Sequence, residues 1–118
     1  MVNGKKNRTV GFDGEKAAKE FLKENNYKIV EQNFRTRFGE IDIIAKDGNY
    51  IVFVEVKTRG EKSFGNPMEA VDYPKQKKII MASEQFLLKK EFFDLQPRFD
   101  VIEVFSESGK INHIINAF

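Results

Sequence analysis

The fold is decided by residues 39–57, which read GEIDIIAKDGNYIVFVEVK. Two runs of β-branched and apolar residues stand on either side of Asp47-Gly48. An Asp-Gly pair between such runs is a strong short-range signal for a β-hairpin. We therefore predict one strand over residues 39–46 and a second strand over residues 49–57, joined by a tight turn at Asp47-Gly48.

This hairpin would sort its side chains onto two faces, because successive side chains of a strand alternate. A tight turn at Asp47-Gly48 sets Asp42 opposite Phe53 and Glu40 opposite Glu55. A four-residue loop keeps the same faces, whereas a three-residue loop would reverse them for one strand. One face then carries Glu40, Asp42, Glu55 and Lys57, and the other carries Ile41, Ile43, Ala45, Val52, Val54 and Val56.

Carboxylates grouped on a face that otherwise looks buried point to a bound cation. Crowded carboxylates repel one another and are costly to bury without a partner. A divalent cation such as Mg²⁺ or Mn²⁺ removes this cost and keeps waters for a phosphate substrate. It also lowers the pKa of a bound water and offsets charge on a phosphodiester. The alternative is a solvated sheet face, with Glu40 and Lys57 as ordinary surface charges.

The motifs of the chain resemble two groups of proteins. Asp42, followed on an apolar strand by Glu55-Val56-Lys57, resembles the PD-(D/E)xK nuclease signature. Ile41 stands where that signature often has proline, which is not a metal ligand. The segments GEIDII, FVEVKTR, PMEAVD and RFDVIEV, with a closing NAF, resemble the YraN-like family of uncharacterised bacterial proteins. That family is similar in its core to archaeal Holliday-junction resolvases.

The resemblance implies a metal-dependent endonuclease that hydrolyses DNA, branched or single-stranded by analogy with the resolvases. Asp42 and Glu55 would ligate Mg²⁺ or Mn²⁺, and the carbonyl of Val56 would add an oxygen ligand. Lys57 would act on the attacking water. Glu40 would have a lesser role, orienting a loop or pairing with a nearby arginine.

Glu15 is a further candidate for the site. It shares a helix face with Ala18 and Leu22, so its carboxylate points towards whatever the helix packs on. The resemblance to resolvases implies that Glu15 joins the metal site as an outer ligand or through water. The alternative is a boundary residue that reaches solvent or pairs with Lys19 one helical turn later.

Basic and polar residues near the motif are candidates for nucleic-acid binding, because arginine and lysine are common partners of backbone phosphates. Lysines at a helix start are also mildly unfavourable unless an anion is near. The alternatives are that the arginines protect a strand edge and the lysines form a solvated helix face. The expected contacts are Arg35, Arg37, Thr58 and Arg59 (the last two opening a loop over residues 58–66), and Lys75, Gln76 and Lys78.

Composition and length bound the class of protein. A chain of 118 residues predicts one domain, in which residues 1–9 form a flexible basic arm. The absence of cysteine excludes disulfides and thiolate metal sites and fits a cytoplasmic location. We find neither a signal peptide nor a run long enough for a bilayer, so no membrane partner is expected. The net charge of +2 is mild, so the clustering of charges matters more than their sum.

Hydrophobic periodicity and turn signals place the remaining elements. We expect a helix at 10–25, a strand at 27–34, a helical turn at 67–71, a helix at 74–90, and strands at 97–105 and 110–115. This order predicts an α/β fold with a mixed sheet. The resemblance implies a restriction-endonuclease-like core, a mixed central sheet of about five strands flanked by helices on both faces.

Two late residues are expected to be structural. Asp100 would pair with an arginine such as Arg98 on a neighbouring strand or order a strand end, although a role as an acidic ligand stays open. His113 is the only histidine, and the proposed chemistry does not require a histidine base.

Two other functions stay open beside the nuclease. One is a non-catalytic module that binds nucleic acid with a nuclease-like fold. The other is an assembly protein whose acidic cluster binds a stabilising ion. A homodimer would suit a junction substrate, which presents two strands to be cut. The apolar residues Phe86, Leu87, Leu88, Phe92 and Phe93 are interpreted as core rather than as a dimer face.

Overall fold

The computed structural model describes residues 12–60, 71–92 and 94–118. The predicted arm at 1–9 and most of the predicted helical turn at 67–71 lie outside these ranges. Within them the elements are α1 (Gly14–Glu24), β1 (Lys28–Arg35), β2 (Glu40–Asp47), β3 (Tyr50–Arg59), α2 (Tyr73–Phe86), the 3-10 helix η2 (Lys90–Phe92), β4 (Gln96–Phe105) and β5 (Ile111–Ile114).

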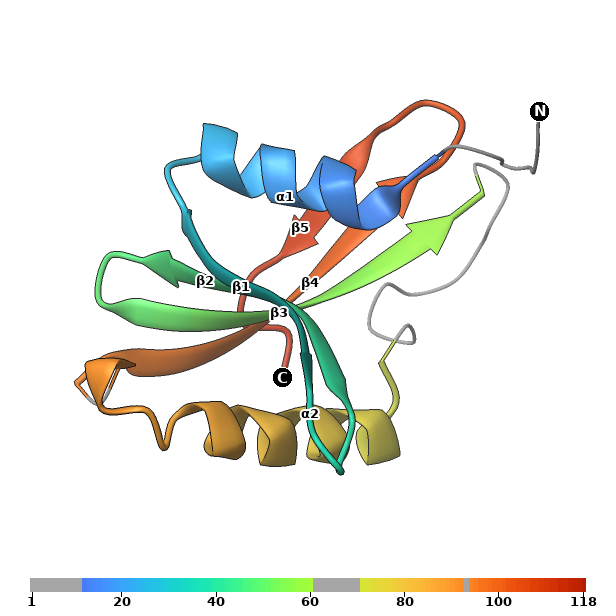
Figure 1. The fold of residues 1–118 in the computed structure, drawn as a ribbon. Coiled ribbons are helices and arrows are strands. Elements are labelled where there is room, and N and C mark those ends of the chain that lie inside the picture. Colours follow the sequence, from blue (N-terminus) through green and yellow to red (C-terminus); the bar gives the residue numbers. More distant parts are fainter. Residues whose placement is uncertain (1–11, 61–70, 93) are drawn as a thin grey trace.

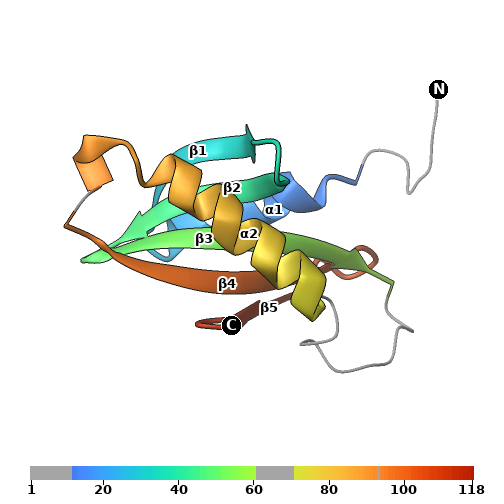
Figure 2. The ribbon, with the colours of Figure 1, turned by 90° about the horizontal axis from the view of Figure 1, so that it is seen from below.

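The five strands form one mixed sheet in the order β1-β2-β3-β4-β5. Neighbours pair antiparallel except β3 and β4, which are parallel and therefore need a crossover connection. Helix α2 lies in that connection and crosses one face of the sheet, whereas α1 covers the other (Figures 1 and 2). The α/β fold with a restriction-endonuclease-like core is thereby confirmed, and β3 is the central strand.

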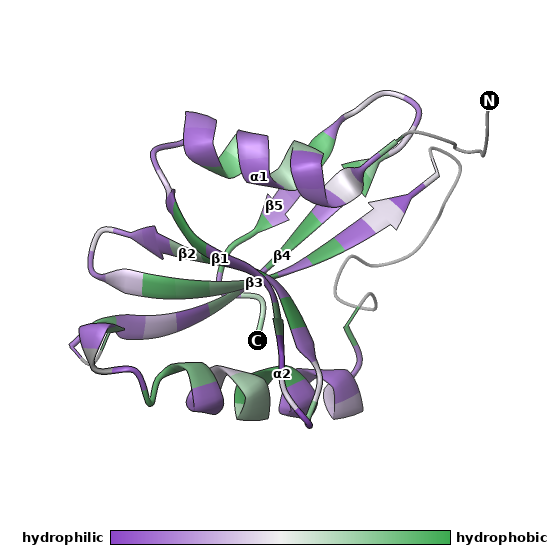
Figure 3. Ribbon diagram, in the orientation of Figure 1, coloured by the Kyte–Doolittle hydropathy of each residue, from purple (hydrophilic) through white to green (hydrophobic). Residues whose placement is uncertain are grey.

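Each face of the sheet has its own hydrophobic core. The core beneath α2 joins Ile44, Ile51 and Phe53 to Ile79, Ala82 and Phe86. The core beneath α1 joins Ile43, Ala45, Val52, Val54, Ile102 and Val104 to Ala18 and Leu22. Figure 3 shows the hydrophobic colour concentrated in the strands between the two helices. Each large side chain buried in this way contributes roughly 1.5–3 kcal/mol to folding.

Helix α1 begins later than the sequence predicted, at Gly14 rather than at residue 10. Asp13 has an extended backbone and its carboxylate accepts the N–H of Lys16, so it caps the helix. Gly14 is buried against β3, and a β-carbon there would lie 2.2 Å from Oγ1 of Thr58. The glycine therefore allows the first turn of α1 to approach β3 closely.

The hairpin of β2 and β3 turns one residue later than predicted. Asp47 still pairs within the strand ladder, and the turn begins at Gly48. The φ of Gly48 is 57°, a left-handed conformation that glycine adopts without strain. Phe53 therefore faces Ile44 rather than Asp42, which corrects the predicted register. The register shifts by an even number of residues, so the shared face predicted for Ile43, Val52 and Val54 is kept.

The alternation of β1 and β2 is interrupted at Asn33 and Asp42. Gln32 pairs with Ile43 and Phe34 pairs with Ile41, but Asn33 has a positive φ of 51°. Ile43 packs beneath α1, whereas Ile41 and Phe34 pack beneath α2. The prediction that Ile41 shares a face with Ile43 is therefore wrong, because the interruption turns the strand over between them.

Two other boundaries differ from the prediction. Helix α2 ends at Phe86 rather than at residue 90, and the chain continues through the short helix η2. Thr58 and Arg59 belong to β3, where they pair with Val104 and Phe105 of β4, and do not open a loop. In the described part of the chain, the helices lack the length and apolar character that a membrane span requires.

Candidate functional site

The candidate site lies where β2 and β3 separate. Their regular pairing ends at Ile43 and Val54, so Glu55 does not face Glu40 as predicted. Instead Oδ2 of Asp42 accepts the N–H of Val56 at 2.8 Å. Figure 1 shows the β1–β2 hairpin bending towards α2 while β3 and β4 continue away from it. The fork thus holds the Asp42 carboxylate against the backbone beside Glu55, a residue that is only 7% exposed.

Negative charge is crowded at this fork. Burial raises the pKa of Asp42 to about 7, and the charge of Glu55 is the next cause. The hydrogen bond from Val56 lowers the pKa of Asp42, while Glu15 and Glu40 raise it further. The charges of the other three acidic residues that the sequence singled out near the motif therefore all act on Asp42. Such a group gains stability from any cation that enters it.

Lys75 in the first turn of α2 supplies one such cation. Its Nζ lies 2.5 Å from Oε2 of Glu55, and the Lys75 side chain is 48% exposed. The hydrogen bond to Glu55 raises the pKa of Lys75. A lysine at a helix start is disfavoured by the helix dipole unless an anion is near. The sequence predicted a phosphate as that anion, whereas the structure places Glu55 there.

Glu15 and Glu40 each have a partner at the rim of the site. Nδ2 of Asn33 donates to Oε1 of Glu15 at 2.9 Å, and Nε of Arg35 donates to Oε2 of Glu40 at 3.1 Å. Asn33 was missed by the sequence reasoning. Its signal was an asparagine inside a predicted strand, since asparagine is depleted in strands and tolerates a positive φ.

The residues that follow Val56 on β3 have different surroundings. Lys57 is exposed, and it shares a face with Glu55 because it lies two positions further along the strand. Thr58 is exposed and packs against Gly14 of α1. Arg59 is different, because its Nε lies 2.5 Å from Oε2 of Glu103 and its side chain is only 15% exposed. Arg59 is thus paired with a residue of the neighbouring strand β4 rather than presented to solvent.

The other predicted nucleic-acid contacts gather between the β1–β2 turn and α2. A β-carbon at Gly39 would lie 3.7 Å from Cβ of Lys78, so the turn lies next to the helix. Arg37 is exposed on this turn, with its guanidinium 4.9 Å from the ring centre of Phe38. Gln76 instead donates to the carbonyl of Val71, which links the first turn of α2 to the residue before the helix cap. Arg37 and Lys78 are both exposed at this rim.

The oxygen atoms of Asp42, Glu55 and the Val56 carbonyl are of the chemical type that binds a hard divalent cation. Carboxylate and carbonyl oxygens are the ligands that Mg²⁺ and Mn²⁺ prefer. Within the described residues, no three or more Asp, Glu, His or Cys side chains are yet arranged around a point that a metal could occupy. Oε2 of Glu55 is engaged by Lys75, so a metal that binds this oxygen would have to displace the lysine.

A second polar cluster lies in β4 and β5, centred on Asp100. Asp100 is fully buried and accepts Nε and NH2 of Arg98 at 3.0 and 2.9 Å. It also contacts Nε2 of His113 at 2.7 Å and accepts the N–H of Asn116 at 3.0 Å. Burial alone would raise the pKa of Asp100, but the hydrogen bonds of His113 and Arg98 lower it. The expected pairing of Asp100 with Arg98 is confirmed, and His113 contacts the same carboxylate.

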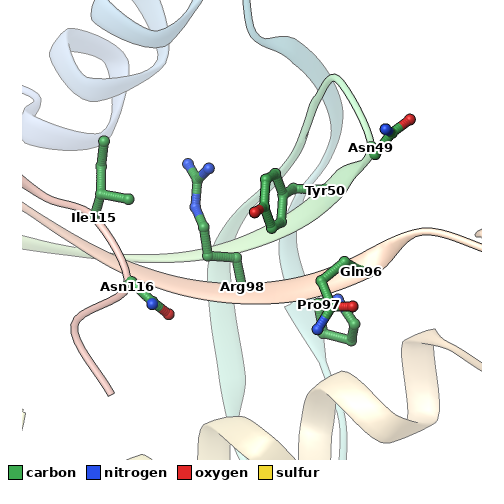
Figure 4. Close-up of a pocket in the computed structure, with 7 residues that line it drawn as sticks. All are labelled: Asn49, Tyr50, Gln96, Pro97, Arg98, Ile115 and Asn116. Carbon is green, nitrogen blue, oxygen red and sulfur yellow. The ribbon is translucent and has the colours of Figure 1, made fainter.

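The same arginine borders a hollow of about 520 Å³ at the end of the sheet away from Asp42. Figure 4 shows the Arg98 side chain between Ile115 and Tyr50. Its NH1 contacts Asp47 at 3.0 Å, and its NH2 donates to the Tyr27 hydroxyl at 2.7 Å. These partners explain why the arginine is tolerated with its side chain only 8% exposed.

The fold and the acidic fork define an α/β protein with a restriction-endonuclease-like core. The profile of the uncharacterised protein family UPF0102 matches residues 14–104, and the chain belongs to this family. The membership that the YraN-like motifs predicted is thereby confirmed.

Three relatives illustrate how closely the family resembles this chain. A UPF0102 protein of Caldanaerobacter subterraneus subsp. tengcongensis is 49% identical over 94% of this chain and 95% of its own length. One from Clostridium kluyveri is 50% identical over 83% of this chain and 80% of its own. One from Acetivibrio thermocellus is 51% identical over 99% of this chain and 97% of its own.

Proposed function

We propose that the protein is a nuclease that uses Mg²⁺ or Mn²⁺ to hydrolyse phosphodiester bonds of DNA. The observation that carries this proposal is the placement of Asp42 at the fork, bonded to the backbone N–H of Val56 beside the buried Glu55. Folding alone gives little reason to crowd carboxylates there, since each raises the cost of burying the other. A cation that binds a phosphate gives a reason.

The residues of the site have distinct proposed roles. Asp42, Glu55 and the Val56 carbonyl would hold the metal, which lowers the pKa of a bound water and offsets charge on the phosphate. Lys57 shares the face of Glu55 and would orient the attacking water or stabilise developing charge. Glu15, held by Asn33, would contact the site through water.

The surroundings of the fork suit a negatively charged polymer. The β1–β2 turn presents Arg35 and Arg37 beside the helix that carries Lys75 and Lys78. Cations of this kind contact backbone phosphates and position a duplex or strand without reading its sequence. The proposed substrate is DNA, branched or single-stranded by analogy with the resolvases, and a fold-level analogy sets no finer specificity.

A cleavage assay tests the proposal. Labelled duplex, single-stranded, flapped and four-way DNA are incubated with Mg²⁺, with Mn²⁺ or with a chelator. We expect metal-dependent cleavage of at least one substrate, which Glu55→Ala and Lys57→Ala abolish. Lys46→Ala is the matched control for charge, since Lys46 is an exposed lysine at the far end of β2. Cleavage that survives Glu55→Ala, or no cleavage by a folded protein that binds Mn²⁺, would contradict the proposal.

A nucleic-acid-binding module without cleavage is the second candidate. The observation that favours it is the ion pair between Lys75 and Glu55, which already neutralises one proposed ligand. This candidate gives salt-dependent DNA binding with no product on any substrate. Measuring DNA binding on the samples of the cleavage assay therefore distinguishes the two candidates. Binding with product favours the nuclease, and binding without product favours the binding module.

A further inference from the structure

We propose that Lys75 is a built-in competitor of the metal: its ammonium group neutralises Glu55 until a divalent cation displaces it. This inference rests on the proposed function, because it concerns the same carboxylates. It adds a regulatory role for a residue on α2 that belongs to neither the acidic set nor the lysine of the E-V-K motif.

The position of the Lys75 ammonium group supports direct competition. Its Nζ is 2.5 Å from Oε2 of Glu55, and its charge also acts on Asp42. A metal that uses the same oxygen cannot bind while the ammonium group occupies it. A metal and an ammonium group at the same carboxylate oxygen repel each other, which favours the exchange of one for the other.

The anchoring of α2 makes the exchange feasible. The helix start is fixed by Asp72, which accepts the N–H of Lys75, and by Gln76, which donates to Val71. The backbone of Lys75 is therefore held in place while its long, half-exposed side chain can rotate towards solvent. Displacement costs a charge-assisted hydrogen bond but needs no movement of the helix.

A consequence is that the ion pair sets the metal concentration at which the site fills. Removing the ammonium group should raise metal affinity, because the cation no longer competes for the Glu55 oxygen. Loss of one charge-assisted hydrogen bond corresponds to a change of roughly tenfold in affinity. A metal-binding role for Lys75 itself is excluded, since an ammonium group has no free electron pair to donate.

Calorimetric titration with Mn²⁺ tests the inference on the full chain without DNA. We expect Lys75→Gln to bind Mn²⁺ about tenfold more tightly than the wild type, and Lys75→Arg to bind with nearly wild-type affinity. Lys77→Gln is the matched control, because Lys77 is an exposed lysine on the same helix that contacts the ring of Tyr73. It should leave the Mn²⁺ affinity unchanged.

The results separate this inference from the proposed function. If the wild type binds Mn²⁺ and Lys75→Gln binds it equally or more weakly, the inference that Lys75 competes with the metal fails. The proposed metal site is then still supported. If neither protein binds Mn²⁺, both the inference and the metal-dependent function fail. An equal gain in Lys77→Gln would assign the effect to overall charge and overturn the role of Lys75.

A second measurement needs no variant and so does not depend on the variant folding. An amine-acylating reagent, followed by mass spectrometry, reports the reactivity of Lys75 and Lys77 in the wild type. We expect Mn²⁺ to increase the labelling of Lys75 severalfold while the labelling of Lys77 stays constant, since a displaced amine is no longer covered by the Glu55 carboxylate. Unchanged labelling of Lys75 at saturating Mn²⁺ would overturn the inference.

Discussion

A carboxylic acid with a raised pKa, such as Asp42, binds its proton more tightly in the folded chain than in the unfolded one. Its pKa rises from 3.8 to about 7 because the group is buried, and because Glu55 is close. Between these values the folded state binds more protons than the unfolded state. Without divalent cations, the free energy of unfolding should therefore decrease as the pH rises through this range.

Replacement of Asp42 by asparagine tests this linkage. We expect the wild type to lose more than about 1 kcal/mol of stability between pH 4 and pH 7 relative to Asp42→Asn, which has no proton to lose. Urea unfolding in a chelating buffer at several pH values measures the difference. Glu20→Gln, a change at an exposed glutamate of α1, should keep the wild-type slope. Identical slopes for wild type and Asp42→Asn would contradict the linkage.

Asp100 is a buried carboxylate of the opposite kind, because its charge is fully compensated. Asp100→Ala would leave Arg98 with its side chain 8% exposed and without its main partner. We expect a loss of about 3–5 kcal/mol of stability, as for other broken buried pairs. Asp47→Ala removes a partner that is 39% exposed, and it should cost no more than about 1 kcal/mol. Equal losses in urea unfolding would show that burial does not decide the effect.

At the scale of elements, the close approach of α1 to β3 depends on a residue without a side chain. Gly14→Ala would place a β-carbon against Oγ1 of Thr58, and overpacking of this kind costs about 1–3 kcal/mol. Thr58→Ala removes that oxygen, leaving a contact of 3.5 Å to the β-carbon. Gly14→Ala should therefore be tolerated in the Thr58→Ala background. A double-mutant cycle in urea checks this, and additive losses would contradict it.

Helix boundaries and hairpin register differ in how far local sequence determines them. The capping residues Asp13 and Asp72 are visible in the sequence, although the first of these helices was predicted to begin too early. The turn was placed one residue early, because Asp-Gly marks a turn without fixing which residue takes the left-handed position. The side on which Ile41 packs could not be predicted, since it depends on the interruption at Asn33.

In the site, too, some contacts could be predicted from the local sequence and others could not. The hairpin predicted that Asp42 lies close to Glu55, but strand alternation fails at Asp42, whose carboxylate instead accepts the N–H of Val56. The ion pair of Lys75 with Glu55 did not follow, because it joins a helix to a strand across a connection whose path the sequence does not reveal. The pairing of Asp100 with Arg98 was predictable, since both lie on one face of the same strand.

At the scale of the whole molecule, charge is distributed unevenly although the net charge is only +2. Exposed cations of the β1–β2 turn lie beside those of α2, next to the acidic fork. This arrangement would place the phosphates of a bound strand near the fork. The affinity for DNA should therefore depend on a few cations and on salt.

Single substitutions at this rim should change the salt dependence of DNA binding. Arg37→Ala and Lys78→Ala should each weaken binding and reduce the slope of log affinity against log salt by about 0.9. Fluorescence anisotropy with a labelled oligonucleotide, in a chelating buffer that prevents cleavage, measures both quantities. Lys46→Ala, at the other end of β2, should leave the slope unchanged. Equal slopes for all three variants would place the DNA elsewhere.

The most direct test of the central claim is to locate the metal. Crystals grown with MnCl₂ are measured near the manganese absorption edge, so that an anomalous difference peak marks the ion. We expect one peak at the fork, about 2.0–2.3 Å from oxygens of Asp42 and Glu55, with Lys75 no longer on Glu55. A well-ordered fork without a peak at saturating Mn²⁺, with Lys75 still paired to Glu55, would contradict the assignment of these carboxylates as a metal site.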